Sequence, residues 1–249
     1  MSCRNWILSS LVVCGSAVAL GGWRVDEAPP HLTQARALVV ALEGSPMNIY
    51  AEGAPKVSWD SRPPLARTVC SSFVTLLLQR SYGWSNSFVK DWTGFIDPHG
   101  RDYHDAIVER NGFKRILHVG EIRPGDFLAI KYPKNRISKD GAEDTGHIMI
   151  VDSMLPDRTT TEPLVTGTHQ YFVSVIDSSH SGHGASDTRH AGRGKFSGGI
   201  GRGIFRIYTD STDRIAGYTW SNEQTSKFCV PEAGDLVAGR LDPNRIPSE

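Results

Sequence analysis

Three side chains in this 249-residue chain could together form a nucleophilic site: Cys70, His147 and Asp177. A cysteine is nucleophilic as its thiolate, so it needs a base that takes its proton and returns it to a leaving group. A histidine titrates near neutral pH and suits this role, and a carboxylate can fix its tautomer and ring orientation. These residue types predict acyl chemistry on a cysteine, provided that the fold brings them together.

The segment that contains Cys70 has the pattern of a helix. Its apolar residues fall at helical spacing on one face: Cys70, Phe73, Val74, Leu77 and Leu78. Thr68 is the expected N-cap, and Gly83 is the expected stop. Cys70 then lies in the first turn, where free N–H groups and the positive end of the helix dipole favour a thiolate. A structural cysteine, in the core or in a disulfide, is the alternative.

His147 and Asp177 stand at the ends of two predicted strands. His147 opens the strand 146–152, where alternation places it on one face with Met149 and Val151, and Asp177 closes the strand 171–177. In an antiparallel sheet the start of one strand lies beside the end of its neighbour, so we expect the two side chains to meet. For His147 alone, a hydrogen-bonded core histidine is the alternative.

The order of the predicted elements indicates an α+β fold. Helices are expected first, over residues 33–43, 70–82, 85–92 and 101–111, with an irregular segment over 45–64. Strands follow, over residues 126–132, 146–152, 171–177, 200–208, 215–220 and 237–241. Helices followed by a run of strands predict N-terminal helices packed on an antiparallel sheet, in one domain over residues 33–249.

Residues 1–19 have the features of an export signal: a positive Arg4, an apolar run and the cleavage pattern Ala17-Val18-Ala19. Residues 20–32 are expected to be a linker. The apolar run is short for a membrane span, so we expect no stable membrane insertion after cleavage. A lipoprotein acylated on Cys14 and an uncleaved N-terminal anchor are the alternatives to a periplasmic or extracellular protein.

Charge and cysteine content narrow the class of protein further. Lys and Arg together number 27, as do Asp and Glu, and this balance argues against nucleic acid or an anionic membrane surface as the main partner. Signal cleavage would leave Cys70 and Cys229, and two cysteines in an exported chain often form a disulfide. A binding or structural protein with a Cys70–Cys229 disulfide is therefore an alternative to an enzyme.

Four segments in order resemble the NlpC-type cell-wall peptidases, which are papain-like cysteine hydrolases. The segments are Val69-Cys70-Ser71-Ser72-Phe73-Val74, Arg123-Pro124-Gly125-Asp126-Phe127-Leu128-Ala129-Ile130, Gly146-His147-Ile148-Met149-Ile150-Val151, and Asp177. The resemblance implies a papain-like fold with Cys70 as nucleophile, His147 as base and Asp177 as the group that orients it. It also implies a peptide or peptidoglycan substrate and no cofactor. Val69 and Ser72 replace the family's usual Asp and Gly, which weakens the likeness of the substrate groove.

Several further residues are candidates for the walls of a cleft. The family's tyrosine upstream of the cysteine has Tyr50 as its candidate counterpart, with Trp59 second, and Ser71 follows the nucleophile. The Cys70 N–H would supply one donor of an oxyanion hole. The second donor is not identified by the sequence.

The Gly- and Ser-rich segment 178–199 is expected to be a loop. It contains His180, His183, Asp187 and His190, which could bind a metal, border the cleft or lie in solvent; their spacing matches no metal motif, and no metal is predicted. Alternating glycines at 199, 201 and 203 predict a strand that another backbone or a substrate approaches closely.

These observations predict an exported cysteine hydrolase that cleaves an amide bond through an acyl-enzyme, with cell-wall peptide as the substrate class. An acyltransferase that uses the same three residues is a further alternative.

Overall fold

The structure is a computed structural model that describes residues 28–62, 64–137, 141, 143–156 and 160–246. The predicted signal peptide over residues 1–19 lies outside the described residues, as does most of the predicted linker. Of the helices in the described part of the chain, none is both long and apolar enough to cross a membrane.

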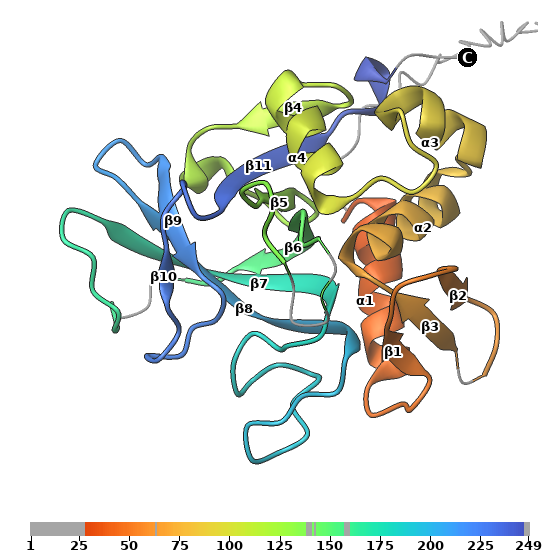
Figure 1. The fold of residues 1–249 in the computed structure, drawn as a ribbon, viewed down its shortest axis with the longest axis horizontal. Coiled ribbons are helices and arrows are strands. Elements are labelled where there is room, and N and C mark those ends of the chain that lie inside the picture. The colour runs from red at the N-terminus through yellow and green to blue at the C-terminus, as the bar shows by residue number, and fades with distance from the viewer. Residues whose placement is uncertain (1–27, 63, 138–140, 142, 157–159, 247–249) are drawn as a thin grey trace, which may run out of the picture.

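The described residues form a mixed α+β fold in which helices precede most of the strands (Figure 1). The helices are α1 (Pro30–Leu42), α2 (Cys70–Tyr82), α3 (Asn86–Thr93) and α4 (Gly100–Glu109), with 3-10 turns at Val119–Glu121 and Pro243–Arg245. The strands are β1 (Asn48–Tyr50), β2 (Lys56–Ser58), β3 (Leu65–Thr68), β4 (Phe113–Ile116), β5 (Phe127–Lys131), β6 (Gly146–Met154), β7 (His169–Ser179), β8 (Gly199–Thr209), β9 (Ile215–Thr219), β10 (Phe228–Cys229) and β11 (Asp235–Leu241). The predicted α+β class and each predicted helix and strand are confirmed, with ends that move by a few residues.

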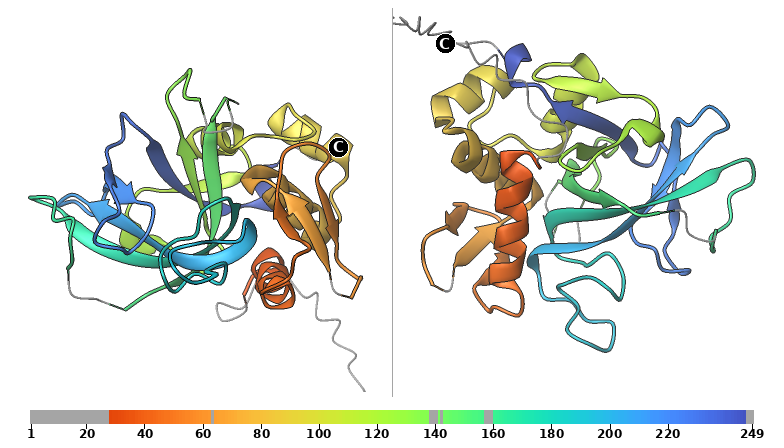
Figure 2. Two further views of the ribbon diagram at one scale, coloured as in Figure 1. Left: turned by 60° about the horizontal axis from the view of Figure 1, so that its bottom comes forward. Right: turned by 180° about the vertical axis from the view of Figure 1, so that it is seen from behind.

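The main sheet has eight strands in the order β10-β9-β8-β7-β6-β5-β11-β4. Every neighbouring pair in it is antiparallel. β9 and β11 also come into contact, although four strands separate them in this order, so the sheet curls. α1, α2 and α3 gather on one side of the sheet (Figure 2).

A small three-stranded sheet, β1-β3-β2, corrects the prediction that residues 45–64 are irregular. Its strands contain three or four residues each, too few to show a period of two in the sequence. The Asn48 side chain joins this sheet to β8: its oxygen accepts from the Ile200 N–H and its NH₂ donates to the Ile200 carbonyl, both at 2.7 Å.

Two helix starts also differ from the prediction. Helix α1 begins at Pro30, inside the predicted linker, because proline is well suited to a first helical turn that needs no N–H. Thr68 is not the N-cap of α2, since it ends β3 and its hydroxyl bonds elsewhere; Val69 occupies the cap position, and its N–H donates to the Ser72 hydroxyl at 3.0 Å. Gly83 ends α2 at φ 72°, as expected.

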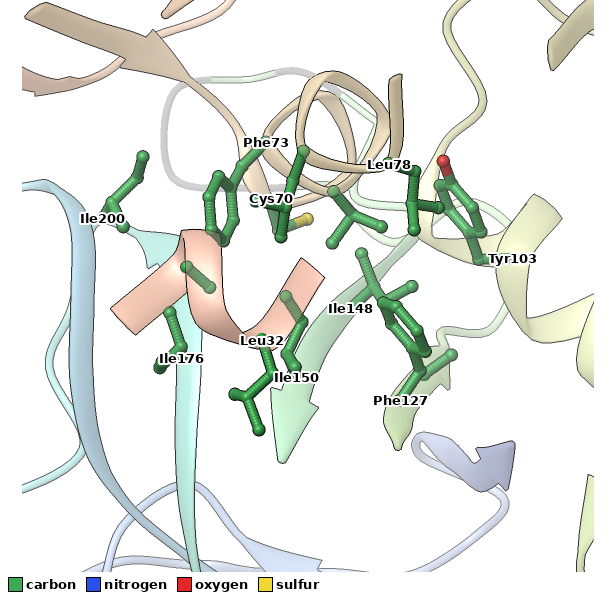
Figure 3. Close-up of a cluster of buried hydrophobic side chains, with 14 of the residues drawn as sticks. Leu32, Cys70, Phe73, Leu78, Tyr103, Phe127, Ile148, Ile150, Ile176 and Ile200 are labelled. Carbon is green, nitrogen blue, oxygen red and sulfur yellow. The ribbon is translucent and has the colours of Figure 1, made fainter. Parts of the chain in front are cut away.

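The sheet separates two hydrophobic clusters. One lies between the helices and the sheet and contains Cys70, Phe73, Leu32, Ile148 and Ile176 (Figure 3). The other lies on the opposite face of the sheet and contains Met149, Val151 and Val175. Residues 148 and 149 therefore point to opposite faces, which confirms the alternation expected for β6.

Candidate active site

A buried contact between β3 and β7 brings the start of α2 to the end of β7. The Thr68 hydroxyl donates to the Ser178 hydroxyl at 3.0 Å, and the Ser178 hydroxyl donates to the Thr68 carbonyl at 3.0 Å. Both residues are fully buried. Because Cys70 follows Thr68 by two residues and Asp177 precedes Ser178, this contact brings the thiol and the carboxylate into one neighbourhood.

The backbone around His147 is tightly enclosed. Gly146 has φ 149°, and a Cβ atom on it would lie 2.1 Å from the Ile130 carbonyl oxygen of β5. A Cβ on Gly100, the first residue of α4, would lie 2.7 Å from the His147 nitrogen. These two glycines let α4 and β5 approach the start of β6 closely, and this packing fixes the position of the His147 backbone.

The structure brings Cys70, His147 and Asp177 together. His147 Nε2 lies 2.6 Å from Asp177 Oδ2, and the Cys70 thiol is close enough to the His147 ring to raise the pKa of the imidazole. The pairing of β6 with β7 runs from Met154–Val173 to Ile150–Ile176, so it stops before His147. The expected meeting of His147 and Asp177 is confirmed.

The charged groups around His147 decide whether its imidazole is ionised. Burial alone would lower the pKa of His147, but the Cys70 thiolate, the Asp177 charge and hydrogen bonds to both raise it to about 10. For Asp177, burial raises the pKa, but the charges of Arg189 and His183 and hydrogen bonds from two histidines outweigh it and hold the pKa well below its usual range. The arrangement favours a protonated His147 beside the Asp177 carboxylate.

His147 opens into a cleft of about 620 Å³. Its walls carry four aromatic side chains and charged groups of both signs. The lining residues are Tyr50, Glu52, Tyr132, Arg136, Glu143, Asp144, Gly146, His147, Ser179, His180, Ser181, Tyr218, Trp220, Lys227 and Cys229. Cys70 is not among these lining residues; it is 6% exposed and lies close to His147, which is one of them.

The three residues that the sequence suggested as cleft candidates lie in different environments. Tyr50 lines the cleft with its ring 4.2 Å from that of His180, and burial and the Cys70 charge raise its pKa. Trp59, which follows β2, instead packs half-buried against the helix-side cluster and does not line the cleft. Ser71 is buried in the first turn of α2, where its carbonyl accepts a hydrogen bond from the Thr75 hydroxyl. Trp59 and Ser71 are thus wrong as cleft residues.

The alternative of a Cys70–Cys229 disulfide is also wrong, because both cysteines are free thiols in the structure. Cys229 lies in β10 at the wall of the cleft, with its Sγ 3.7 Å from the Val230 carbonyl oxygen. Tertiary packing keeps Cys70 at the start of α2, within the helix-side cluster and close to His147.

Comparison with known proteins gives one informative relative. The chain is 36% identical over 186 residues to the uncharacterized protein R653 of Acanthamoeba polyphaga mimivirus, a match that covers 72% of this chain and 79% of the viral protein. This chain belongs to the R653 family. No protein-family model matches the chain, and no solved structure matches it.

In this member of the R653 family, the loop between β7 and β8 supplies site residues that the sequence left undecided. His183, Asp187 and Arg189 are 0%, 4% and 2% exposed, and His183 and Arg189 contact Asp177. They do not lie in solvent. His180 borders the cleft, as one of the three interpretations had it, while His190 packs half-buried on Phe196.

The alternating glycines of β8 explain how this loop of the R653-family chain is accommodated. A Cβ on Gly201 would lie 2.4 Å from Arg189 Nε, and a Cβ on Gly203 would lie 2.3 Å from Asp187 Oδ2. The predicted close approach to this strand is confirmed, and the approaching group is the chain's own ionic loop. This glycine pattern was the signal from which the burial of the loop could have been inferred.

In the part of the R653-family chain that the structure describes, no three His, Cys, Asp or Glu side chains are grouped so that they could hold a metal ion. His183, Asp187 and Arg189 instead form hydrogen bonds and ion pairs with each other and with Asp177. The candidate site thus presents a thiol, an imidazole and a carboxylate next to an open cleft.

Proposed function

We propose that the protein is a papain-like cysteine hydrolase of the NlpC type that cleaves an amide bond. The observation that supports this most is the chain of contacts from the Cys70 thiol to the His147 ring and on to Asp177 at 2.6 Å. The thiol stands in the first turn of a helix, where free N–H groups stabilise negative charge. The aromatic cleft beside His147 is large enough for a segment of a peptide.

The reaction begins with attack of the Cys70 thiolate on the substrate carbonyl carbon, which forms a C–S bond. The His147 imidazolium then gives its proton to the amide nitrogen, and the C–N bond breaks. The amine departs, and the acyl group remains on Cys70 as a thioester. Neutral His147 next takes a proton from a water molecule whose oxygen attacks the thioester. Breaking of the C–S bond releases the carboxylic acid and restores the thiolate–imidazolium pair.

Two donors near the thiol could stabilise the oxyanion of each tetrahedral intermediate. The backbone N–H of Cys70 is one, since it lies in the first turn of α2 and precedes the helical hydrogen bonds. Tyr50 is our candidate for the second. Burial and the nearby Cys70 charge raise the pKa of its hydroxyl, so the hydroxyl keeps its proton and can donate it.

Cell-wall peptide is the substrate class that we propose, on the resemblance to the NlpC-type enzymes. The cleft has Glu52 and Lys227 as exposed charges of opposite sign and aromatic walls, which suits a peptide that carries both charge signs. Export through the N-terminal segment 1–19 would bring the enzyme to such a substrate.

The pH dependence of Cys70 alkylation tests the proposal. Iodoacetamide is added across a pH series, and mass spectrometry of the Cys70 peptide separates its rate from those of the other cysteines. We expect a midpoint well below the ~8.5 of an ordinary thiol, and we expect His147→Ala to return it to that value. A midpoint near that of Cys229 in both proteins would contradict the proposal.

Product analysis then separates hydrolysis from acyl transfer. A mixed peptide library is incubated with the protein, with and without an added amine. A free carboxylic acid in both samples indicates hydrolysis, and a new amide in the second indicates transfer.

A further inference from the structure

Asp177 is shared by two imidazole rings. Its Oδ2 atom lies 2.6 Å from His147 Nε2 and 3.1 Å from His183 Nε2. His183 comes from the loop between β7 and β8, and both His183 and Asp177 are fully buried. A carboxylate that only had to orient His147 would not need a second histidine on the same oxygen.

The second ring nitrogen of His183 shows that this ring is charged. His183 Nδ1 lies 2.6 Å from the carbonyl oxygen of Trp220, at the end of β9. A carbonyl and a carboxylate can only accept hydrogen bonds, so both nitrogens of His183 must carry protons. His183 is therefore an imidazolium that donates in two directions.

Arg189 and Asp187 complete a buried ionic cluster. Arg189 Nη2 lies 2.9 Å from Asp177 Oδ1 and 2.8 Å from Asp187 Oδ2. Asp187 Oδ2 also accepts the backbone N–H of His183 at 2.7 Å, and Arg189 Nη1 donates to the Gly199 carbonyl at 3.1 Å. Asp187 thus holds both cations in place behind Asp177.

The charges of this cluster balance. His147, His183 and Arg189 are positive when protonated, and Cys70, Asp177 and Asp187 are negative when ionised, so the set sums to zero with the thiolate formed. A buried set with uncompensated charge would be costly. Without Cys70 the remaining five residues carry one net positive charge, which favours ionisation of the thiol.

From these contacts, and resting on the function proposed above, we infer that His183, Asp187 and Arg189 are positioning residues. They hold Asp177 as a carboxylate against His147 and set the positive charge that the Cys70 thiol experiences. None of the three lines the cleft, although His183 packs against Trp220, which does; they act through Asp177. The loop 180–198 is then part of the catalytic apparatus.

Substitutions of opposite sign distinguish a role in charge from a role in packing. His183→Gln removes a positive charge, so the alkylation midpoint of Cys70 should rise by about one pH unit; Asp187→Asn removes a negative charge and should lower it by a similar amount. Loosened packing would instead move the Cys70 midpoints of both variants in the same direction. Arg189→Met should raise the alkylation midpoint of Cys70, whereas Arg189→Lys, which keeps the positive charge, should leave it close to the wild-type value.

His104→Gln is the matched control. His104 is also a buried histidine between acidic groups, Asp105 at 2.9 Å and Asp235 at 3.0 Å, but it does not line the cleft. Its substitution should leave the Cys70 midpoint unchanged. Shifts of the same sign in His183→Gln and Asp187→Asn, or an equal shift in His104→Gln, would overturn the inference.

Nuclear magnetic resonance of ¹⁵N-labelled wild-type protein tests the same inference without any substitution. Because each ring nitrogen of His183 faces an acceptor, we expect both to carry a proton at pH 7. A single protonated nitrogen there would overturn the inference even if Cys70 proves reactive. An ordinary Cys70 midpoint with His183 doubly protonated would instead count against the proposed function and leave the charged cluster standing.

Discussion

The hydroxyl oxygens of Thr68 and Ser178 lie 3.0 Å apart in the interior of the protein. These two residues are 110 positions apart in the chain. Ser178 directly follows Asp177, and Thr68 precedes Cys70 by two positions. Their contact joins the short strand that leads into α2 to the end of β7. It adds a buried polar link to the direct packing of α2, which carries Cys70, against β7, which carries Asp177.

Removal of this link should reduce both stability and thiol reactivity. Ser178→Ala leaves the Thr68 hydroxyl and carbonyl without their buried partner, so we expect a loss of about 1 to 3 kcal/mol in the free energy of unfolding. Cys70 alkylation at neutral pH should slow, because α2 is no longer held against β7. Urea unfolding and alkylation rates measure the two effects.

Ser61→Ala is the control for that experiment, since the Ser61 hydroxyl bonds the Ser58 carbonyl at 3.0 Å on the surface. Its effect should stay within about 0.5 kcal/mol. Equal effects of the two substitutions would show that the β3–β7 contact is unimportant.

Gly146→Ala should destabilise the protein strongly. The residue has φ 149°, and its added Cβ would lie 2.1 Å from a backbone oxygen of β5, so a strand must move. We expect a loss of about 2 to 4 kcal/mol. Gly167→Ala has a similar left-handed constraint, φ 77°, but open space around it, and should cost about 1 to 2 kcal/mol. Thermal and urea unfolding of both variants would reveal whether the close approach matters.

Acid should destabilise the protein through His31. Burial lowers the pKa of His31 to about 4, against a weaker opposing effect of its hydrogen bond to the Gly125 carbonyl. The unfolded chain binds a proton near pH 6.5 and the folded chain does not, so stability falls as the pH drops from about 6.5 to 4, by on the order of 3 kcal/mol.

His31→Gln removes this titration, and its free energy of unfolding should depend less on pH in that window than that of the wild type. Urea unfolding at several pH values gives both slopes. Parallel slopes would mean that His31 takes up its proton equally in the folded and unfolded chains.

A rise in pH should destabilise the protein through His147, whereas it is a fall in pH that destabilises it through His31. The pKa of His147 is raised to about 10, so the folded chain holds a proton that the unfolded chain releases near pH 6.5. The resulting stabilisation is complete below about pH 6.5 and is lost as the pH rises through about 10.

His147→Gln should therefore show a flatter loss of stability on the alkaline side. Cys229→Ser controls for thiol ionisation elsewhere at the cleft and should keep the wild-type slope. If His147→Gln keeps that slope too, the imidazolium is not stabilised in the folded protein.

Local patterns were enough to predict most elements of the fold. The Cys70 helix shows its 3.6-residue period and its stop at Gly83, and β6, β7 and β8 are long apolar strands with clear boundaries. The small sheet of β1, β2 and β3 was missed because a strand of three or four residues has too few side chains to show alternation. Its existence depends on contacts with β8 that no local pattern records.

The candidate site divides in the same way. Cys70, His147 and Asp177 stand at element ends, where residue type and position together suggest chemistry. Trp59 was misplaced because an aromatic residue suits a core and a cleft equally well. The composition of the loop could not assign His183, Asp187 and Arg189, because charged residues in a Gly-rich loop look alike whether they are solvated or buried; only the alternating glycines of β8 signalled that a group packs there.

Neighbours a few residues apart in the sequence were enough to predict the helix that starts at Cys70, the strand ends at His147 and Asp177, and the α+β order. Long-range packing established that the thiol is free, that Tyr50 faces the cleft and Trp59 does not, and that a charged loop supports Asp177. Those outcomes depend on which distant groups share a low-dielectric interior, where each charge must find a partner.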